Sequence, residues 1–88
     1  MLGGDFLEDG IEIYCKRELE TLSLAIGYYR KKRGLTQSKL ASLAGVSRQH
    51  IGAIESPSMR RPFSVELLIK ICYILNIAPD ELFGFSGA

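Results

Sequence analysis

The sequence predicts an all-α protein, a bundle of about five short helices in one domain. Apolar residues recur at helical spacing in several segments, and these segments are bordered by good N-cap residues and by glycine or proline. The chain has 88 residues, of which 47% are hydrophobic and 24% charged, as is typical of a single globular domain. We expect an acidic N-terminal extension (1–18), a helical domain (19–84) and a C-terminal tail (85–88).

The first helix is predicted from the apolar residues at positions 11, 15, 19, 22, 26 and 29. They indicate either one long amphipathic helix or a short helix that leads into another. A short strand over 11–15 is an alternative, because Ile11, Ile13 and Cys15 alternate. The helix should end at Gly34, after cations that the helix dipole favours in a last turn: Arg30, Lys31, Lys32 and Arg33.

Two short helices should follow. Thr36 is a suitable N-cap for a second helix from Gln37 to Leu43 or Ala44, and Gly45 is its stop signal. Ser47 is a suitable N-cap for a third helix that runs to about Glu55. The sequence therefore predicts two short helices separated by very few residues.

The connection between these two helices must be a tight turn, since only Gly45 and Val46 separate the second helix from the cap of the third. Such helices cross at a steep angle and need small side chains at their contact, which Ala41 and Gly45 provide. Spacing places an apolar set inward: Leu40, Val46, Ile51 and Ile54. The outward face of the third helix is then left with Arg48, Gln49, Gly52, Ala53 and Ser56.

Two more helices complete the bundle. Ser64 is expected to cap a fourth helix, Val65 to Leu75, and Pro79 to open a last short one through Phe83. A loop should precede the fourth helix, because the chain there contains Ser56, Pro57, Ser58 and Pro62.

Charge is distributed unevenly, although the net charge is only +1. Residues 1–20 hold two basic and six acidic side chains, a net charge of −4. Residues 21–65 hold eight basic side chains and one acidic, a net charge of +7. A basic surplus of this kind is expected where a protein contacts nucleic acid. Arg and Gln on the outward face are also suited to base edges, because Arg pairs with guanine and Gln with adenine.

In this arrangement the sequence resembles the lambda-repressor-like helix-turn-helix family, also called the Cro-type or Xre family. The resemblance runs from about Leu22 to Phe83 and is carried by three stretches, RKKRGLTQSKLASLAGVSRQHIGAIE, RRP and SVELLIKICYILNIAPDELF. It implies five helices, of which the third lies in the major groove of double-stranded DNA and the second crosses above the backbone.

The resemblance also implies DNA contacts for individual residues. Arg48 and Gln49 would reach base edges, and Ala53, one turn later, would touch a thymine methyl group. Gln37 would lie beside a phosphate and brace the third helix. Phosphate contacts or positioning roles are further implied for Lys32, Lys39, Ser47, His50, Ser56, Arg60 and Arg61.

One implied contact is structural, a partly buried ion pair between Arg30 and Glu55. One feature departs from the family pattern, since Ser56-Pro57 stands where the family often has Asn-Gly.

The fourth helix is apolar on nearly all sides, which predicts burial against a partner. One stripe suffices for the core of a single chain: Val65, Leu68, Cys72 and Leu75. The other apolar residues are expected to form a homodimer contact: Leu67, Ile71, Tyr73, Ile74, Phe83 and Phe85. Alternatively, the N-terminal extension covers this surface within one chain.

These features favour a sequence-specific binder of double-stranded DNA, a transcriptional repressor acting as a dimer. The alternative is an antitoxin or another protein-interaction module that binds a partner protein, with DNA binding secondary. An enzyme is not expected, because one histidine and two distant cysteines provide no metal, cofactor or acid–base site. We expect a cytoplasmic protein without membrane contact, since neither a long apolar run nor a secretory signal is present.

Overall fold

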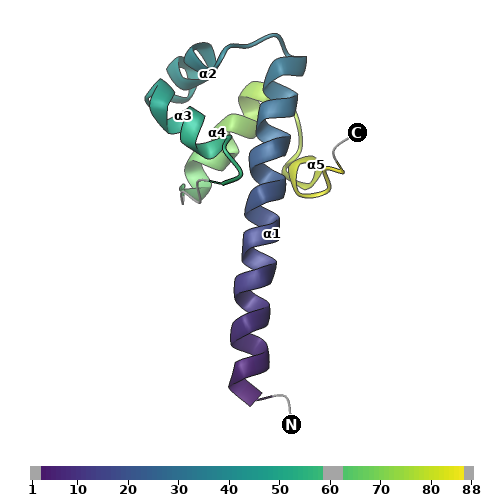
Figure 1. Cartoon of the computed structure of the whole chain (residues 1–88). Helices are drawn as coiled ribbons and strands as arrows, with labels where there is room; N and C mark the ends of the chain where they lie inside the picture. The colour runs from purple at the N-terminus through teal and green to yellow at the C-terminus, as the bar shows by residue number, and fades with distance from the viewer. Residues whose placement is uncertain (1–2, 59–62, 87–88) are drawn as a thin grey trace.

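The computed structural model describes residues 3–58 and 63–86, and within these ranges every regular element is an α-helix (Figure 1). The five helices are α1 Gly3–Lys32, α2 Gln37–Ala44, α3 Arg48–Ile54, α4 Val65–Leu75 and α5 Pro79–Phe83. The all-α prediction is therefore confirmed, and the alternative of a strand over 11–15 is wrong because those residues lie in α1.

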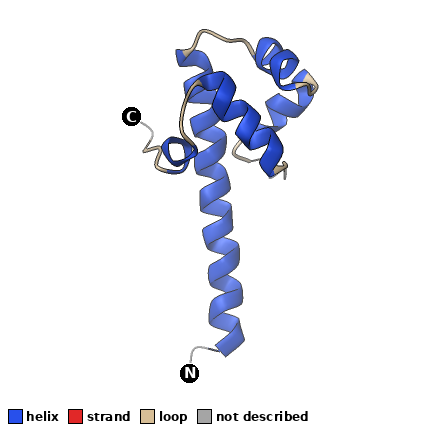
Figure 2. Ribbon diagram, turned by 180° about the vertical axis from the view of Figure 1, so that it is seen from behind, coloured by secondary structure: helices blue, strands red, loops and turns tan. Residues whose placement is uncertain are grey.

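The first helix is one continuous element of 30 residues. It begins at Gly3, earlier than the apolar pattern indicates, because glycines at 3, 4 and 10 are weak helix formers and obscure the signal. The boundary at residue 18 falls inside α1. The four shorter helices pack around the C-terminal half of α1, and its N-terminal half extends away from them (Figures 1 and 2).

The N-caps are those that the sequence predicts. The side-chain oxygens of Thr36, Ser47 and Ser64 accept hydrogen bonds from the backbone N–H three residues later, at 3.0, 3.0 and 3.1 Å. Each bond satisfies an N–H that has no partner within the helix. These caps explain why α2, α3 and α4 begin where they do.

The turn between α2 and α3 depends on Gly45. Its φ of +76° lies in the left-handed region, which glycine adopts without steric cost. The chain reverses there, and the Val46 N–H donates to the Ala41 carbonyl at 3.0 Å. Ala41 is 2% exposed, so the small residues expected at the helix contact do lie in the interface.

Two residues that were expected at a dimer contact, Leu67 and Ile71, lie in the core of the single chain instead. Leu67 and Ile71 are 5% and 0% exposed and belong to the core of the single chain. Val65, which was expected in the core, is 72% exposed. The buried face of α4 follows Leu67, Ile71 and Leu75 at intervals of four residues, because α4 packs against both α1 and α2.

The outer face of α4 remains uncovered, with Ile69 59% and Tyr73 86% exposed. The described side chains of α1 from residue 7 to 17 are exposed as well. The alternative in which the N-terminal extension covers this face is therefore wrong, because α1 is straight and carries the extension away from the domain (Figure 1).

The C-terminal segment packs against α1. Phe85 contacts Tyr28 and Tyr29, with ring centroids 5.1 and 6.0 Å apart. This contact within one chain half-buries the Phe85 side chain, which was expected in a dimer contact. Phe83, from the same expected set, is 45% exposed.

Within residues 3–58 and 63–86, no helix combines the length and apolar character needed to cross a membrane.

Candidate nucleic-acid interface

The first turn of α3 presents Arg48 and Gln49 to solvent, and both side chains are exposed. Ile51 and Ile54 on the opposite side are 0% and 2% exposed and anchor the helix to the core. Because Ser47 caps the N-terminus, the backbone that carries Arg48 and Gln49 is fixed. The turn therefore presents two long polar side chains from a rigid support. Helix α3 itself lies at the edge of the domain (Figure 1).

Ala53 does not lie on the outward face of α3 that the sequence predicts for it. It is 8% exposed and packs with the core, so its methyl group does not form part of the outward face. The inward face of this short helix is wider than expected, because Ala53 and Ile54 are both buried. The outward residue one turn after Arg48 is Gly52, which is partly exposed.

Gly52 has no side chain to fill the space between Gln37 and Arg48. A Cβ built at Gly52 would lie 3.7 Å from Gln37 Oε1 and 3.9 Å from Arg48 Nη1, both ordinary contacts. Another surface can therefore approach the α3 backbone closely between Arg48 and Gln37.

The C-terminal end of α3 is fixed by Glu55. Arg30 at the end of α1 donates from Nε to Glu55 Oε2 at 2.6 Å and from Nη2 to Glu55 Oε1 at 3.0 Å. The two side chains are only 9% and 7% exposed. The structure thus contains the partly buried ion pair that the resemblance implies, in the bidentate geometry that favours Arg–carboxylate pairs.

Two further hydrogen bonds join this ion pair to α2. Gln37 Nε2, at the first residue of α2, donates to Glu55 Oε1 at 3.0 Å. Arg30 Nη1 donates to the Leu35 carbonyl at 2.7 Å, which fixes the connection between α1 and α2. Gln37 therefore braces α3. The Leu35 contact could not be predicted from the sequence, because a backbone carbonyl leaves no signal in the residue type.

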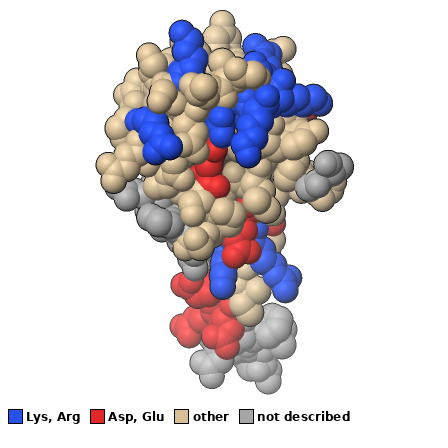
Figure 3. Space-filling model, turned by 45° about the horizontal axis from the view of Figure 1, so that its top comes forward, with Lys and Arg blue, Asp and Glu red and all other residues tan. Residues whose placement is uncertain are grey.

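Most of the basic side chains lie on the domain, and acidic side chains gather along the projecting half of α1, where Lys16 and Arg17 also lie (Figure 3). Lys32 and Lys39 are both exposed. Lys32 Nζ lies 5.8 Å from the centroid of the Tyr28 ring, within the range of a cation–π contact. Arg60 and Arg61 lie outside the described residues.

Three more of the residues with implied phosphate contacts, Ser47, His50 and Ser56, have local contacts within the chain. Ser47 uses its hydroxyl to cap α3, by accepting from the N–H of the half-buried His50. The Ser56 hydroxyl lies 3.3 Å from that of Ser58 in the loop after α3. Ser47 and His50 therefore lie at the exposed first turn of α3, whereas Ser56 follows the other end of the helix.

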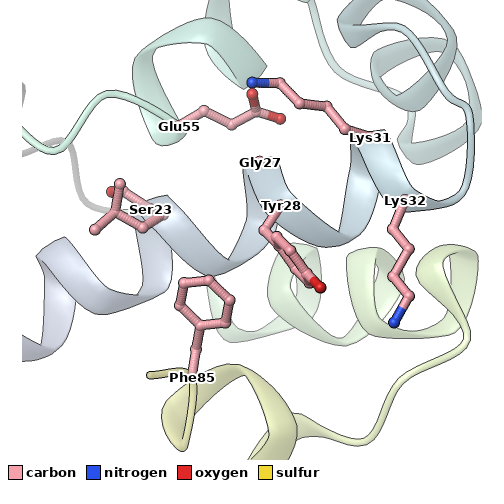
Figure 4. Close-up of a pocket in the computed structure, with 8 residues that line it drawn as sticks. Ser23, Gly27, Tyr28, Lys31, Lys32, Glu55 and Phe85 are labelled. Atoms are coloured by element: carbon pink, nitrogen blue, oxygen red, sulfur yellow. The ribbon is translucent and has the colours of Figure 1, made fainter. Parts of the chain in front are cut away.

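An open hollow of about 730 Å³ lies on α1 between Glu55 and Phe85. Glu55 and Lys31 lie on one side of α1, and Tyr28, Lys32 and Phe85 lie on the other (Figure 4). The Glu55 carboxylate already accepts three hydrogen bonds. Among the described residues, no group of three His, Cys, Asp or Glu side chains could hold a metal ion.

Known proteins share this architecture. A family model described as helix-turn-helix matches residues 26–82. The restriction-modification controller protein C.AhdI from Aeromonas hydrophila is 30% identical, with a TM-score of 0.67 over 75% of this chain and 97% of that chain. The clp gene regulator ClgR from Corynebacterium glutamicum is 28% identical, with a TM-score of 0.66 over 72% of this chain and 65% of that chain. No curated protein matches the chain.

The matched residues include the whole of α2, α3 and α4, together with both members of the Arg30–Glu55 pair. They therefore include the exposed turn of α3 and the contacts that hold it. The chain belongs to the lambda-repressor-like (Xre) family of helix-turn-helix DNA-binding regulators.

Proposed function

We propose that this protein is a sequence-specific transcriptional regulator, in which α3 enters the major groove of double-stranded DNA and reads base edges with Arg48 and Gln49. One observation carries the proposal: both side chains are exposed on the first turn of a helix that is fixed at both ends. Arg donates two hydrogen bonds to guanine, and Gln both donates to and accepts from adenine. A fixed helix lets such contacts discriminate between bases.

Phosphate contacts would surround the reading turn. The exposed Lys39 on α2 and Lys32 at the end of α1 supply positive charge. Gln37 has an amide oxygen and a second N–H beyond its bond to Glu55, so it can brace α3 and also donate to a phosphate. Further phosphate contacts are proposed for Ser47, His50, Ser56, Arg60 and Arg61.

The regulator would act as a repressor and bind its operator as a homodimer. The dimer contact would be formed by apolar residues of α4 and α5. Ile69, Tyr73 and Phe83 are exposed there, and Ile74 is half-buried. A two-fold dimer would place two copies of α3 about 34 Å apart, one helical turn of DNA, on an inverted repeat. Both solved relatives are named as a controller or a regulator, in keeping with this role.

Selection of bound duplexes from a random pool tests the proposal. We expect an enriched inverted repeat with half-sites one helical turn apart, and an affinity that falls with increasing salt. Arg48→Ala should lose preference at one base pair in each half-site. A protein-interaction module would instead show no salt-dependent affinity for duplex DNA, and that result would reject the proposal.

A further inference from the structure

The amide of Gln37, the first residue of α2, has a fixed direction. Its Nε2 donates to Glu55 Oε1 at 3.0 Å. An ionised carboxylate accepts hydrogen bonds and cannot donate them, so the amide must turn its NH₂ group toward Glu55 and its oxygen away. Arg30 in turn holds the Glu55 carboxylate with two bonds, of 2.6 and 3.0 Å. The Gln37 oxygen therefore has a set direction in the free chain.

This oxygen lies close to Gly52, on the outward side of α3. A Cβ built at Gly52 would lie 3.7 Å from Gln37 Oε1 and 3.9 Å from Arg48 Nη1. One place on α3 therefore has a hydrogen-bond acceptor and a hydrogen-bond donor beside it. Gly52 is partly exposed and carries no side chain, so a ligand that approaches α3 at this place meets both atoms.

A G·C base pair carries the matching pattern in the major groove. Guanine presents two acceptors, N7 and O6, and the cytosine paired with it presents an amino donor at N4. An arginine that donates to both guanine acceptors leaves this amino group for an acceptor from the protein. An A·T pair matches less well, because adenine offers only one acceptor there and thymine offers no donor.

We propose that Gln37 is a further specificity-determining residue, whose Oε1 accepts from the amino group of the cytosine paired with the guanine that Arg48 reads. The inference rests on the proposed function, because it requires Arg48 at that guanine. Arg48 and Gln37 then read one base pair through both of its bases. One of the two side chains comes from α3 and the other from α2, so the ion pair of Arg30 with Glu55 keeps them in register.

This role differs from the two roles of Gln37 described above. The brace uses one N–H of the amide, and a phosphate contact would use the other. Neither role uses the oxygen, and a phosphate has no hydrogen to donate to it. Bracing and phosphate binding act alike on every DNA sequence, whereas an acceptor at a base edge discriminates between sequences.

Binding to a base analogue tests the inference. In the selected operator, 2-pyrimidinone would replace the cytosine paired with the guanine that Arg48 reads, which removes the amino group and adds no bulk. We expect the wild-type chain to bind this duplex about fivefold to tenfold more weakly than the operator, since the Gln37 oxygen then loses its donor. Gln37→Met keeps the length of the side chain without the amide, and it should bind both duplexes equally.

Two controls make the comparison specific. Gln49→Met is the same substitution on the first turn of α3, and it should keep the wild-type sensitivity to the missing amino group even where its overall affinity falls. The same analogue at a cytosine outside the contacted half-sites measures the effect of weaker base pairing, and it should change affinity less than about twofold. The wild-type measurement does not depend on the folding of any variant.

A second analogue separates this inference from the proposed function. Replacement of the guanine by 7-deazaguanine removes the N7 acceptor, and it should weaken binding by the wild-type chain but not by Arg48→Ala. If it weakens neither, Arg48 does not read this guanine and both proposals fail. If it weakens wild-type binding but loss of the amino group does not, the reading by Arg48 stands and the inference about Gln37 is overturned. Equal sensitivity of Gln37→Met and wild type to the amino group would overturn it too, because Gln37 would then act only as a brace or at a phosphate.

Discussion

Arg30 and Glu55 join two helix ends that lie 25 residues apart in the sequence. The guanidinium of Arg30 also fixes the Leu35 carbonyl, and the carboxylate of Glu55 also holds Gln37. The end of α1, the start of α2 and the end of α3 therefore meet at one pair of charges. Since α3 carries the candidate base-reading side chains, this pair determines the angle at which they are presented.

Loss of one member of the pair should destabilise the fold strongly. Glu55→Gln keeps the shape but leaves the Arg30 guanidinium buried without a counter-charge, which we expect to lower the free energy of unfolding by about 3 kcal/mol. Urea denaturation measures the change. Glu66→Gln is the control: its partner Lys70 lies 3.5 Å away and both side chains are more than half exposed, so a loss below about 0.5 kcal/mol is expected. Similar losses in both variants would contradict the structural role of the pair.

Burial raises the pKa of the Cys72 thiol above its ordinary value of 9.0. The unfolded chain then releases this proton at a lower pH than the folded chain, so stability falls as pH rises through and above 9. Cys72→Ala should reduce that decline, although it costs packing at every pH. Thermal unfolding from pH 7 to 10 gives the comparison, and identical slopes for the wild type and the Cys72 variant would refute the argument.

Much of the fold could be predicted from local chemistry. Cap residues act within one turn, so Thr36, Ser47 and Ser64 identify the starts of three helices, and Gly45 identifies the turn between two of them. The ion pair of Arg30 with Glu55 was implied only by the resemblance, because nothing local to either residue indicates the other.

Tertiary packing decided the features that could not be predicted. An apolar helix such as α4 has several faces that could be buried, and only the positions of α1 and α2 select the one with Leu67 and Ile71. For the same reason the burial of Ala53 was missed, since a small residue fits either a core or an outward face. One long helix from Ile11 was among the alternatives, but its start at Gly3 was missed because glycines weaken the pattern.

Replacement of Arg48 should change specificity, whereas replacement of a phosphate-binding lysine should change only affinity. Arg48→Ala is expected to cost about 1–3 kcal/mol in binding to the selected operator and to relax preference at one base position. Lys39→Ala should weaken all duplexes alike and reduce the slope of affinity against salt by about one ion. Titration of the operator and of single-base variants at two salt concentrations separates these outcomes. Full discrimination by the Arg48 variant would mean that another residue reads the base.

Replacement of Gly52 by alanine should separate stability from binding. The new Cβ would meet Gln37 and Arg48 only at ordinary contact distances, so the folded chain has room for it. Alanine is the better helix former by about 1 kcal/mol, and the free energy of unfolding should rise by up to that amount. Operator affinity should nevertheless fall, because the methyl group occupies the space between Arg48 and Gln37 where DNA would approach α3. Gly10→Ala is the control: it lies in the projecting half of α1 and its Cβ would meet nothing within 4 Å, so it should stabilise the chain without weakening binding. If Gly52→Ala bound the operator as tightly as wild type, close approach of DNA at Gly52 would be wrong.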